Sequence, residues 1–491
     1  MKVNHPKSSE CPFKKIKSQY IVKNIFEHLE KKKVLQLIKY NKNIQKKLEI
    51  NVLNYIEMYE QIEQIEIIVK PFQILKNENN KFINIEKEEE KDYFHVFFND
   101  SDNEEKRCYF MGNEEITKIK IILDYKFNSF NNLFENCECI GTINFTKFKR
   151  NNILDMSYMF KNCSSLVTLD LSHFNTNNVK NMCHMFGNCS SLSNLDLTNF
   201  NTNNVENMSN MFEGCQYLYK LNLSNFNTIK VTDMKFMFSE CLSLRELEVS
   251  HFNTTNITNM KYMFNKCWKL QELSISNFNT EKVESMICMF AKCNLLKRLN
   301  VSNFKTTNVN DMSSMFQECS SLKELDISNF KLENTRNMSF MFAKCISIIK
   351  IKLPNCNTNS VRNMNYMFSD CSSLKELDAS NFRIDRALNM KSMFCGCSSI
   401  VKLNLSNFYT NLVEDMSHMF EGCSLLKELN VSNFNTNSVK NMSHMFQGCS
   451  SLRELNISNF NTENTIFMDS MFDGCILLNK FCLNYLINSR F

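Results

Sequence analysis

A Met-Phe pair followed by two variable residues and a cysteine recurs every 26 residues through two thirds of the chain. The first full copy is Met159-Phe160 with Cys163, and the last is Met471-Phe472 with Cys475. A degenerate copy at Leu133-Phe134 with Cys137 precedes them, giving 14 copies without insertion or deletion. A fixed period of this length predicts a solenoid, in which each coil buries its apolar face only by stacking on its neighbours.

The first half of each coil predicts a short helix. Met156, Met159, Phe160 and Cys163 lie at i, i+3, i+4 and i+7, which is the spacing of one helix face. Asp155 stands immediately before them, where an Asp or Asn side chain accepts hydrogen bonds from the first-turn amides. Glycine, which favours the left-handed backbone that ends helices, occupies the far end in five coils: Gly214, Gly396, Gly422, Gly448 and Gly474.

The second half of each coil predicts a short strand. Leu166, Leu169 and Leu171 have the spacing L-x-x-L-x-L, which is typical of leucine-rich repeats. The last two leucines alternate with polar residues, as in a strand buried on one side. Parallel strands need a crossover connection between them, and the helix would supply it. The predicted fold class is therefore α/β, a leucine-rich-repeat solenoid of about 14 coils with a short helix and a short parallel strand in each.

The most regular coils carry a family resemblance. Residues 415–436 (DMSHMFEGCSLLKELNVSNFNT) and 441–462 (NMSHMFQGCSSLRELNISNFNT) closely resemble the BspA-like leucine-rich repeats. The resemblance covers roughly residues 130–485. It implies an α/β leucine-rich solenoid used for binding, often adhesion, and it offers no catalytic residues to carry over to this chain.

The chain before the repeats predicts two further units. We expect a helical segment at residues 1–62, a β-rich cap at 63–129, and the solenoid with a C-terminal cap at 130–491. Solenoid ends need such covers because a bare end exposes core and unpaired strand. The last strand of the β-rich unit is expected to pass its sheet edge to the first coil. Its strand-like runs are Glu66–Val69, Lys81–Ile85, Tyr93–Phe98, Arg107–Phe110 and Lys118–Tyr125.

The helical segment resembles a divergent F-box over residues 18–48. The resemblance rests on the apolar residues Ile21, Ile25, Phe26 and Leu29, although the Leu-Pro start of that motif is missing. An F-box would imply docking onto a Skp1-type adaptor of a cullin ubiquitin ligase. The alternative is a helical hairpin that caps or tethers the solenoid.

Catalytic motifs are not found in the sequence. It contains no Gly-x-Gly-x-x-Gly or Walker loop, and no HExxH, CxxC or Ser-His-Asp set with credible spacing. His184, His418 and His444 share one position of the repeat, but that position varies and does not predict a metal site. A net charge of +5 over 491 residues does not favour nucleic-acid binding. We therefore expect a non-enzymatic protein without cofactor or metal that binds another protein.

The outward face of the strands carries many acidic and amide side chains. One hypothesis is a docking face for a basic or amide-rich protein segment. The alternative is solubility encoded by the repeat, because Lys323, Lys375 and Lys427 directly precede three of the glutamates. The candidate partner-binding residues are Glu246, Glu272, Glu324, Asp326, Glu376, Asp378, Glu428 and Glu454.

The sequence also bears on the compartment. No signal-peptide pattern and no run of 18 apolar residues is present. Most of the 22 cysteines occupy one repeat position on the apolar face, where thiols pack as small hydrophobes. We expect a reduced, cytoplasmic protein that acts as a scaffold, and one hypothesis for its role is a ubiquitin-ligase substrate adaptor. The alternative is a BspA-like adhesin or scaffold at the cell surface.

One zone of the repeats is irregular. Pro354 and Cys356 replace a Ser and the repeat Phe, and Arg383 and Arg386 interrupt a turn that is otherwise rich in Asn and Thr. Irregularity at constant coil length can reflect neutral drift or a specific contact. The sequence leaves both open.

Overall fold

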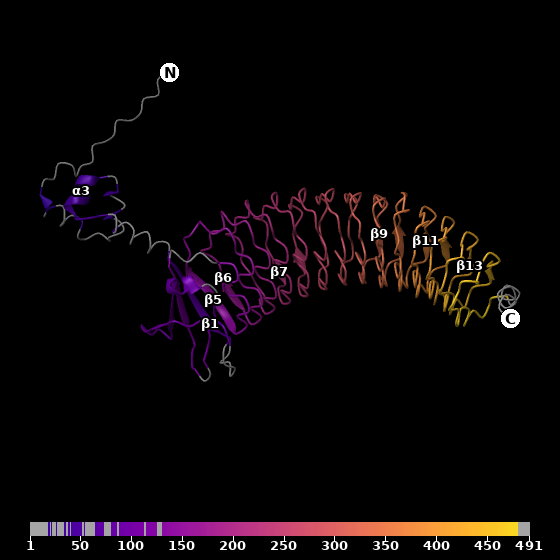
Figure 1. The fold of residues 1–491 in the computed structure, drawn as a ribbon, viewed down its shortest axis with the longest axis horizontal. Helices are drawn as coiled ribbons and strands as arrows, with labels where there is room; N and C mark the ends of the chain where they lie inside the picture. Colours follow the sequence, from indigo (N-terminus) through magenta and orange to yellow (C-terminus); the bar gives the residue numbers. More distant parts are fainter. Residues whose placement is uncertain are drawn as a thin grey trace, which may run out of the picture.

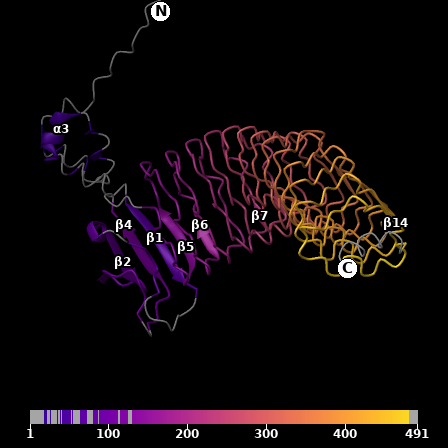
Figure 2. The same ribbon diagram turned by 45° about the vertical axis from the view of Figure 1, so that its right-hand side comes forward.

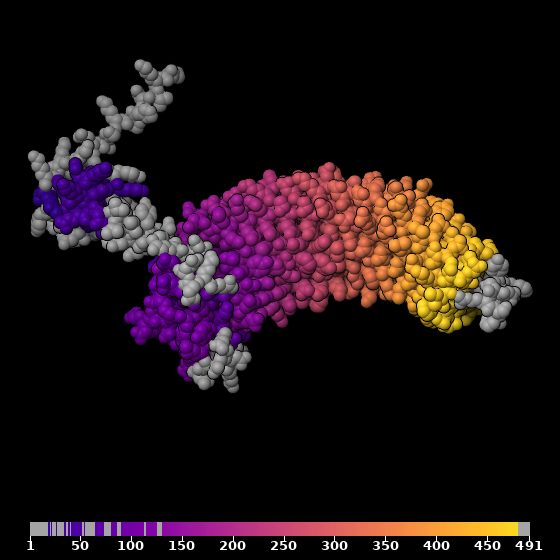
Figure 3. Space-filling view, viewed as in Figure 1, coloured from indigo at the N-terminus to yellow at the C-terminus, as the bar shows by residue number. Residues whose placement is uncertain are grey.

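The structure is a computed structural model in which the repeats stack side by side along a curved arc (Figures 1 and 2). In the space-filling view the stacked coils form a continuous surface (Figure 3). The residues that it describes are 18–19, 21, 26, 34–35, 38–39, 41–51, 54, 64–72, 80–85, 88–111, 114–124 and 130–479. Among them, no helix is long and apolar enough to cross a membrane.

A six-stranded sheet begins the arc, in the order β3-β2-β4-β1-β5-β6. Strand β1 pairs antiparallel with both β4 and β5, and β5 pairs parallel with β6. The prediction that the last strand before the repeats joins the first coil was wrong, since β4 lies between β2 and β1 instead. The bounds are β1 Ile65–Pro71, η2 Glu88–Tyr93 (a 3-10 helix), β2 Phe94–Phe98, β3 Glu104–Glu105, β4 Ile119–Leu123, β5 Ile140–Lys147 and β6 Thr168–Asp170.

Alternating side chains explain why β1 takes the central position. Ile65, Ile67 and Val69 are fully buried and belong to the same apolar core as the coils. The backbone amide of Asn84 donates to the carbonyl of Leu133 at 2.7 Å. The first turn of the repeats is thus covered by this N-terminal unit, which satisfies backbone groups that a bare solenoid end would expose.

The predicted helix in each coil is absent. Residues 130–479 contain no helix, and the Met-Phe-x-x-Cys segment is a run of turns. Tyr158 and Asn162 have φ angles of 59° and 60°, and the equivalent residues of the other coils are also left-handed. Left-handed residues four positions apart cannot belong to an α-helix.

Hydrogen bonds to the next coil replace the bonds of a helix. The backbone amides of Tyr158 and Phe160 donate to the carbonyls of Cys183 and Met185, both at 2.9 Å. The amide of Lys161, between the next two residues that bond to the neighbouring coil, bonds within its own turn, to the carbonyl of Tyr158 at 3.0 Å. A two-turn helix would leave most of its end groups without intrahelical partners, whereas this arrangement pairs alternate amides with the neighbouring coil.

The predicted N-cap residues take part in this ladder. Asp155 accepts the amide of Ser157 at 2.8 Å, which closes a local side-chain turn instead of capping a helix. The same position of successive coils forms 12 parallel bridges, from Asp155↔Asn181 to Asn441↔Phe467. The regular part of the solenoid is therefore a helix-poor stack of about a dozen turns, held on this side by an unbroken ladder.

Short strands are present on the opposite side, as predicted, but their ladder is interrupted. Four parallel pairs form, β7 with β8, β9 with β10, β11 with β12, and β13 with β14. Among the described residues, the equivalent segments at 194–196, 272–274 and 298–300 have no assigned strand. The bounds are β7 Lys220–Leu221, β8 Glu246–Leu247, β9 Glu324–Asp326, β10 Lys350–Lys352, β11 Glu376–Asp378, β12 Lys402–Asn404, β13 Glu428–Leu429 and β14 Glu454–Leu455.

A buried threonine provides a third connection between coils. The Thr280 hydroxyl accepts the amide of Lys305 at 2.7 Å and donates to the carbonyl of the same residue at 2.9 Å. Its side chain is fully buried, so these two backbone groups would otherwise lack partners. Leu332 and Ile384 occupy the threonine position in two coils, both within the irregular zone or next to it.

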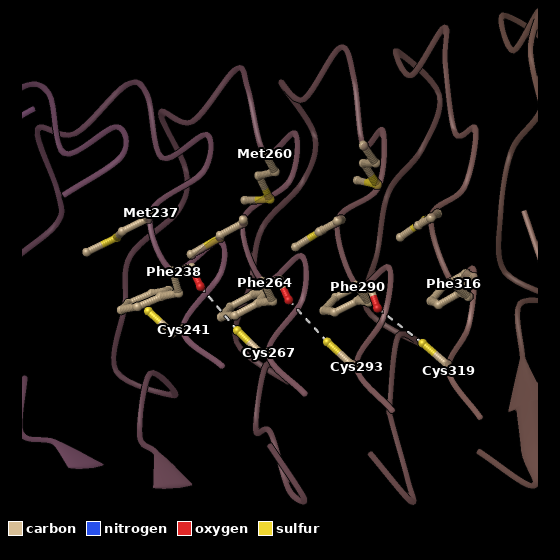
Figure 4. Close-up of a cluster of buried hydrophobic side chains, with 14 of the residues drawn as sticks. Met237, Phe238, Cys241, Met260, Phe264, Cys267, Phe290, Cys293, Phe316 and Cys319 are labelled. Atoms are coloured by element: carbon tan, nitrogen blue, oxygen red, sulfur yellow. Dashed lines mark hydrogen bonds between the residues drawn. The ribbon is translucent and has the colours of Figure 1, made fainter. Parts of the chain in front are cut away.

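The core consists of parallel columns of identical side chains (Figure 4). Phe264 is fully buried, and its ring stacks on Phe238 and Phe290 at centroid distances of 5.6 and 5.7 Å. The thiol of Cys293 donates to the carbonyl of Phe264 at 3.2 Å, and the bond recurs along the cysteine column. The interpretation of these cysteines as packing residues is supported, because each one also satisfies a buried carbonyl.

The N-terminal segment has its own small core. Phe26, Val34, Ile38 and Ile44 form an apolar cluster separate from that of the solenoid. Helix α3 (Lys42–Lys47) carries Ile44, and the side chain of Asn41 accepts the amide of Ile44 at 3.2 Å to cap it.

Candidate functional site

The outward face of the strands is built by alternation along each coil. In β9, Glu324 and Asp326 are exposed, whereas Leu325 between them is buried. The same alternation places the acidic residues of β8, β11, β13 and β14 on this face. Glu272 is also exposed, although its coil has no assigned strand. All eight candidate residues therefore lie outward, as the strand pattern requires.

Lysines from neighbouring coils interrupt the acidic row. Lys402 lies 3.6 Å from Glu376, and Lys220 lies 3.8 Å from Glu246. Lys350 faces Glu324 in the strand register. The sequence interpretation had considered only the basic residues that precede each glutamate. The 26-residue spacing itself would have revealed the lysines that occupy the glutamate position in other coils.

Glu428 and Glu454 are neighbours in this row, as are Glu246 and Glu272, but only Glu428 and Glu454 are paired in assigned strands. They are register partners in the parallel pair of β13 and β14, so two carboxylates of the same charge face each other. Within the part of the chain that the structure describes, neither makes an ion pair. Like charges directly opposite each other on adjacent strands are destabilising.

A shallow depression of about 610 Å³ lies over this part of the face. Glu376, Lys402, Glu428 and Glu454 line one row of it, and the next outward row is Asp378, Asn404, Asn430 and Asn456. The depression thus unites four of the eight candidate residues. Glu246, Glu272, Glu324 and Asp326 lie outside it.

The two aspartates of the candidate set have a structural role. Asp378 accepts the amide of Ser380 at 3.0 Å and so closes the turn after β11. Asp326 does the same for Ser328 and also lies 2.7 Å from Lys352. The hydrogen bond from Lys352, followed by those from Ser328, lowers the pKa of Asp326 to about 2. These two carboxylates already accept hydrogen bonds from their own chain, so the glutamates are the groups more available to a partner.

The four adaptor-docking candidates are only partly described. Ile21 is 50% exposed, whereas Phe26 is buried in the small N-terminal core. Ile25 and Leu29 lie outside the described residues. The structure therefore presents one of the four, Ile21, as an accessible apolar side chain.

The three histidines at one repeat position form stacked aromatic contacts. His184 stacks on Tyr158 at 4.8 Å, and His418 stacks on His444 at 4.6 Å. The Nδ1 atom of His418 lies 2.6 Å from Glu421. Among the described residues, no group of three or more His, Cys, Asp or Glu side chains converges as a metal site would require.

His184 is expected to make stability depend on pH. Burial, and then Lys161 and Lys235, lower its pKa from 6.5 to about 4. Protonation therefore favours the unfolded chain, so the stabilisation is complete above pH 6.5 and is lost as pH falls toward 4. We expect a loss of about 1–2 kcal/mol between pH 7 and pH 5, allowing for solvent screening. Urea unfolding at several pH values measures it.

The variant His184→Asn provides the control for this effect. Asn210 occupies the same position of the next coil with a φ of 58°, so asparagine tolerates this left-handed backbone. The variant should lose the part of the pH dependence that His184 causes. An identical pH slope in wild type and variant would contradict the assignment.

Comparison with known proteins identifies the repeat. The family described as "Mycoplasma protein of unknown function, DUF285" matches residues 128–246, 219–325, 243–351, 323–402 and 388–489. These matches together span well over half of the chain. The chain belongs to the DUF285 family. No curated protein matches it significantly.

Solved structures similar to this DUF285 chain include one described as a leucine-rich repeat protein. This protein, from Eubacterium ventriosum, is 12% identical to the chain and gives a TM-score of 0.23. The alignment covers 45% of this chain and 81% of the Eubacterium protein. The functional domain of InlJ from Listeria monocytogenes, described as including a cysteine ladder, is 16% identical and gives a TM-score of 0.20. The alignment covers 63% of this chain and 70% of the InlJ domain. The protein in the TLR13–ssRNA13 complex is 15% identical and gives a TM-score of 0.20. The alignment covers 65% of this chain and 54% of that protein.

Proposed function

We propose that this DUF285 protein is a non-enzymatic interaction scaffold whose strand face binds a partner protein. The observation that carries the proposal is the pair Glu428 and Glu454, which face each other in an open depression and make no ion pair within the described residues. A lysine or arginine from a partner would relieve the repulsion between the two carboxylates and gain charge-assisted hydrogen bonds.

The neighbouring amide row favours an extended, basic segment as the partner. The side-chain oxygens of Asn430 and Asn456 accept the amides of Ser432 and Ser458, at 3.0 and 3.1 Å. Their Nδ2 groups make no hydrogen bond within the described part of the chain. These groups can donate to the backbone carbonyls of a segment lying across the coils, while Glu428 and Glu454 bind its basic side chains.

Charge reversal on the full-length protein tests the proposal. A fluorescent peptide of alternating lysine and threonine serves as the probe, and fluorescence anisotropy measures its affinity. Reversal by Glu428→Lys with Glu454→Lys should weaken binding about tenfold or more, because two attractive charge pairs become repulsive.

The double variant Glu246→Lys with Glu272→Lys is the matched control, because it makes the same charge change outside the depression. Its affinity should stay within about twofold of wild type at 150 mM salt, where screening limits interactions beyond roughly 8 Å. Equal losses in both double variants would show that only net charge matters, and would reject the site.

An adaptor role is a second candidate, which the separate N-terminal core and the exposed Ile21 favour. We propose that this segment docks a Skp1-type adaptor while the solenoid selects a substrate. Purified adaptor should bind the full-length protein and lose affinity on Ile21→Asp. Absence of binding would leave the helical segment as a cap or tether. The surface-adhesin alternative predicts instead that the protein is labelled on intact cells by a membrane-impermeant reagent.

A further inference from the structure

Arginines are concentrated in the irregular zone of the solenoid. The chain has ten arginines, and four of them, Arg336, Arg362, Arg383 and Arg386, lie within three successive coils. All four are exposed. Elsewhere the repeats carry their positive charge mainly on lysine, so this segment differs in the chemistry of its cations as well as in its irregularity.

The repeat register places these side chains on one surface. The amide of Arg362 donates to the carbonyl of Arg336 at 2.9 Å, and the amide of Leu388 donates to Arg362 at 2.8 Å. These three residues therefore form one row across adjacent coils. Arg383 and Arg386 belong to the coil that ends at Leu388, a few residues before it.

The next coil continues the surface with apolar side chains. Tyr409 and Leu412 occupy the positions that Arg383 and Arg386 hold one coil earlier, 26 residues before them. Leu388, Tyr409 and Leu412 are 39%, 43% and 48% exposed. We call the four arginines together with these three apolar residues the arginine patch.

The patch replaces a hydrogen bond that holds the coils together elsewhere. At the position of Arg386 and Leu412, asparagine in six coils donates from Nδ2 to a carbonyl of the preceding coil, at 2.6–2.9 Å. Neither Arg386 nor Leu412 makes this bond in the described structure. Loss of a local stabilising contact in exchange for exposed arginine and leucine is typical of a site kept for binding.

The charge of the patch is not neutralised by its own chain. Within the described residues, none of the four arginines makes an ion pair. The acidic residues closest to these arginines in sequence are Glu333 and Asp385, and Glu414 in the next coil is paired with Lys440 at 2.7 Å. Four guanidinium groups against two carboxylates leave the surface positive.

We propose that the arginine patch is a second docking surface, which binds an acidic, apolar-bearing segment of a partner protein. Guanidinium groups bind carboxylates through two parallel hydrogen bonds. Leu388, Tyr409 and Leu412 would bury apolar side chains of the same segment. The partner is opposite in charge to the one proposed for the strand face, so the two proposals can fail independently.

The test uses the full-length protein and a fluorescent peptide of alternating glutamate and leucine, measured by fluorescence anisotropy at 150 mM salt. The first variant is Arg383→Asn with Arg386→Asn, which restores the asparagine of regular coils. It should weaken binding about tenfold, while thermal stability is unchanged or higher because residue 386 can again donate to the carbonyl of Asn359. The second variant, Leu388→Asn with Leu412→Asn, removes exposed apolar surface without changing charge and should weaken binding by at least about fivefold.

The matched control is Arg245→Asn with Arg298→Asn, which removes two exposed arginines outside the patch and should change affinity by less than about twofold. A peptide with glutamine in place of glutamate should not bind. Equal weakening by the control variant would overturn the proposal. So would a single-stranded oligonucleotide that binds more tightly than the peptide and is unaffected by the two leucine substitutions, because the surface would then be a simple polyanion site.

Discussion

Replacing Phe264 with alanine is expected to lower the free energy of unfolding by about 3–5 kcal/mol. The ring is fully buried and stacks between Phe238 and Phe290. Its removal would open a cavity in the middle of a continuous column, where both neighbouring coils are fixed by hydrogen bonds and cannot close the gap. Urea unfolding followed by circular dichroism measures the loss.

Tyr217→Ala is the matched control for this prediction. Tyr217 is an aromatic residue two coils away that is 64% exposed, so its removal should change stability by no more than about 0.5 kcal/mol. Because each coil contacts only its neighbours, amide exchange in Phe264→Ala should rise most in the coils around residue 264. Equal destabilisation by both variants would contradict the assignment of this column as the core.

The thiols of the cysteine column are expected to react about a thousandfold more slowly with a disulfide reagent in the folded protein than in the unfolded chain. Burial raises the pKa of Cys293 and of Cys345 to about 12. At pH 8 the reactive thiolate fraction falls from roughly a quarter to about one in ten thousand. A thiol titration with and without 6 M guanidinium measures the two classes.

The half-buried cysteines provide the comparison within the same molecule. Cys288 and Cys356 lie outside the column and are only partly buried, so they should react earlier than Cys293. Cys288→Ser should remove one group from the fast class, and Cys293→Ser one from the slow class. If both substitutions reduced the fast class, the column would not be a buried packing feature. All the cysteines that the structure describes are free thiols.

The helix prediction failed for a specific reason. Met156, Met159, Phe160 and Cys163 satisfy the spacing of a helix face, but two successive four-residue turns place the same positions inward. The glycines at residues 214 and 396 correctly indicated one left-handed position in each coil. The second left-handed position holds residues such as Tyr158 and His184, which carry no glycine signal.

The exposure of the candidate residues could be predicted from the sequence, whereas their role in binding stays a prediction. Strand alternation placed Glu376, Glu428 and Glu454 on the outward face correctly. Alternation within one coil does not show that Lys402 lies between Glu376 and Glu428 in the same row, because that order follows only from the 26-residue register between coils. The assignment of Asp326 and Asp378 to binding stays a prediction, and the structure adds that they accept hydrogen bonds from Ser328 and Ser380 and so close turns.

The sequence by itself determined the period, the residues that form the core and the outward direction of the acidic row. Each of these depends on which side chains avoid water, and that information is local to one coil. Only the tertiary structure decided that the Met-Phe-x-x-Cys segment forms turns and that β1 joins the first coil. The amide of Tyr158 can bond to the carbonyl of Cys183 only once two coils are stacked. An interaction that requires two coils cannot be read from the spacing within one.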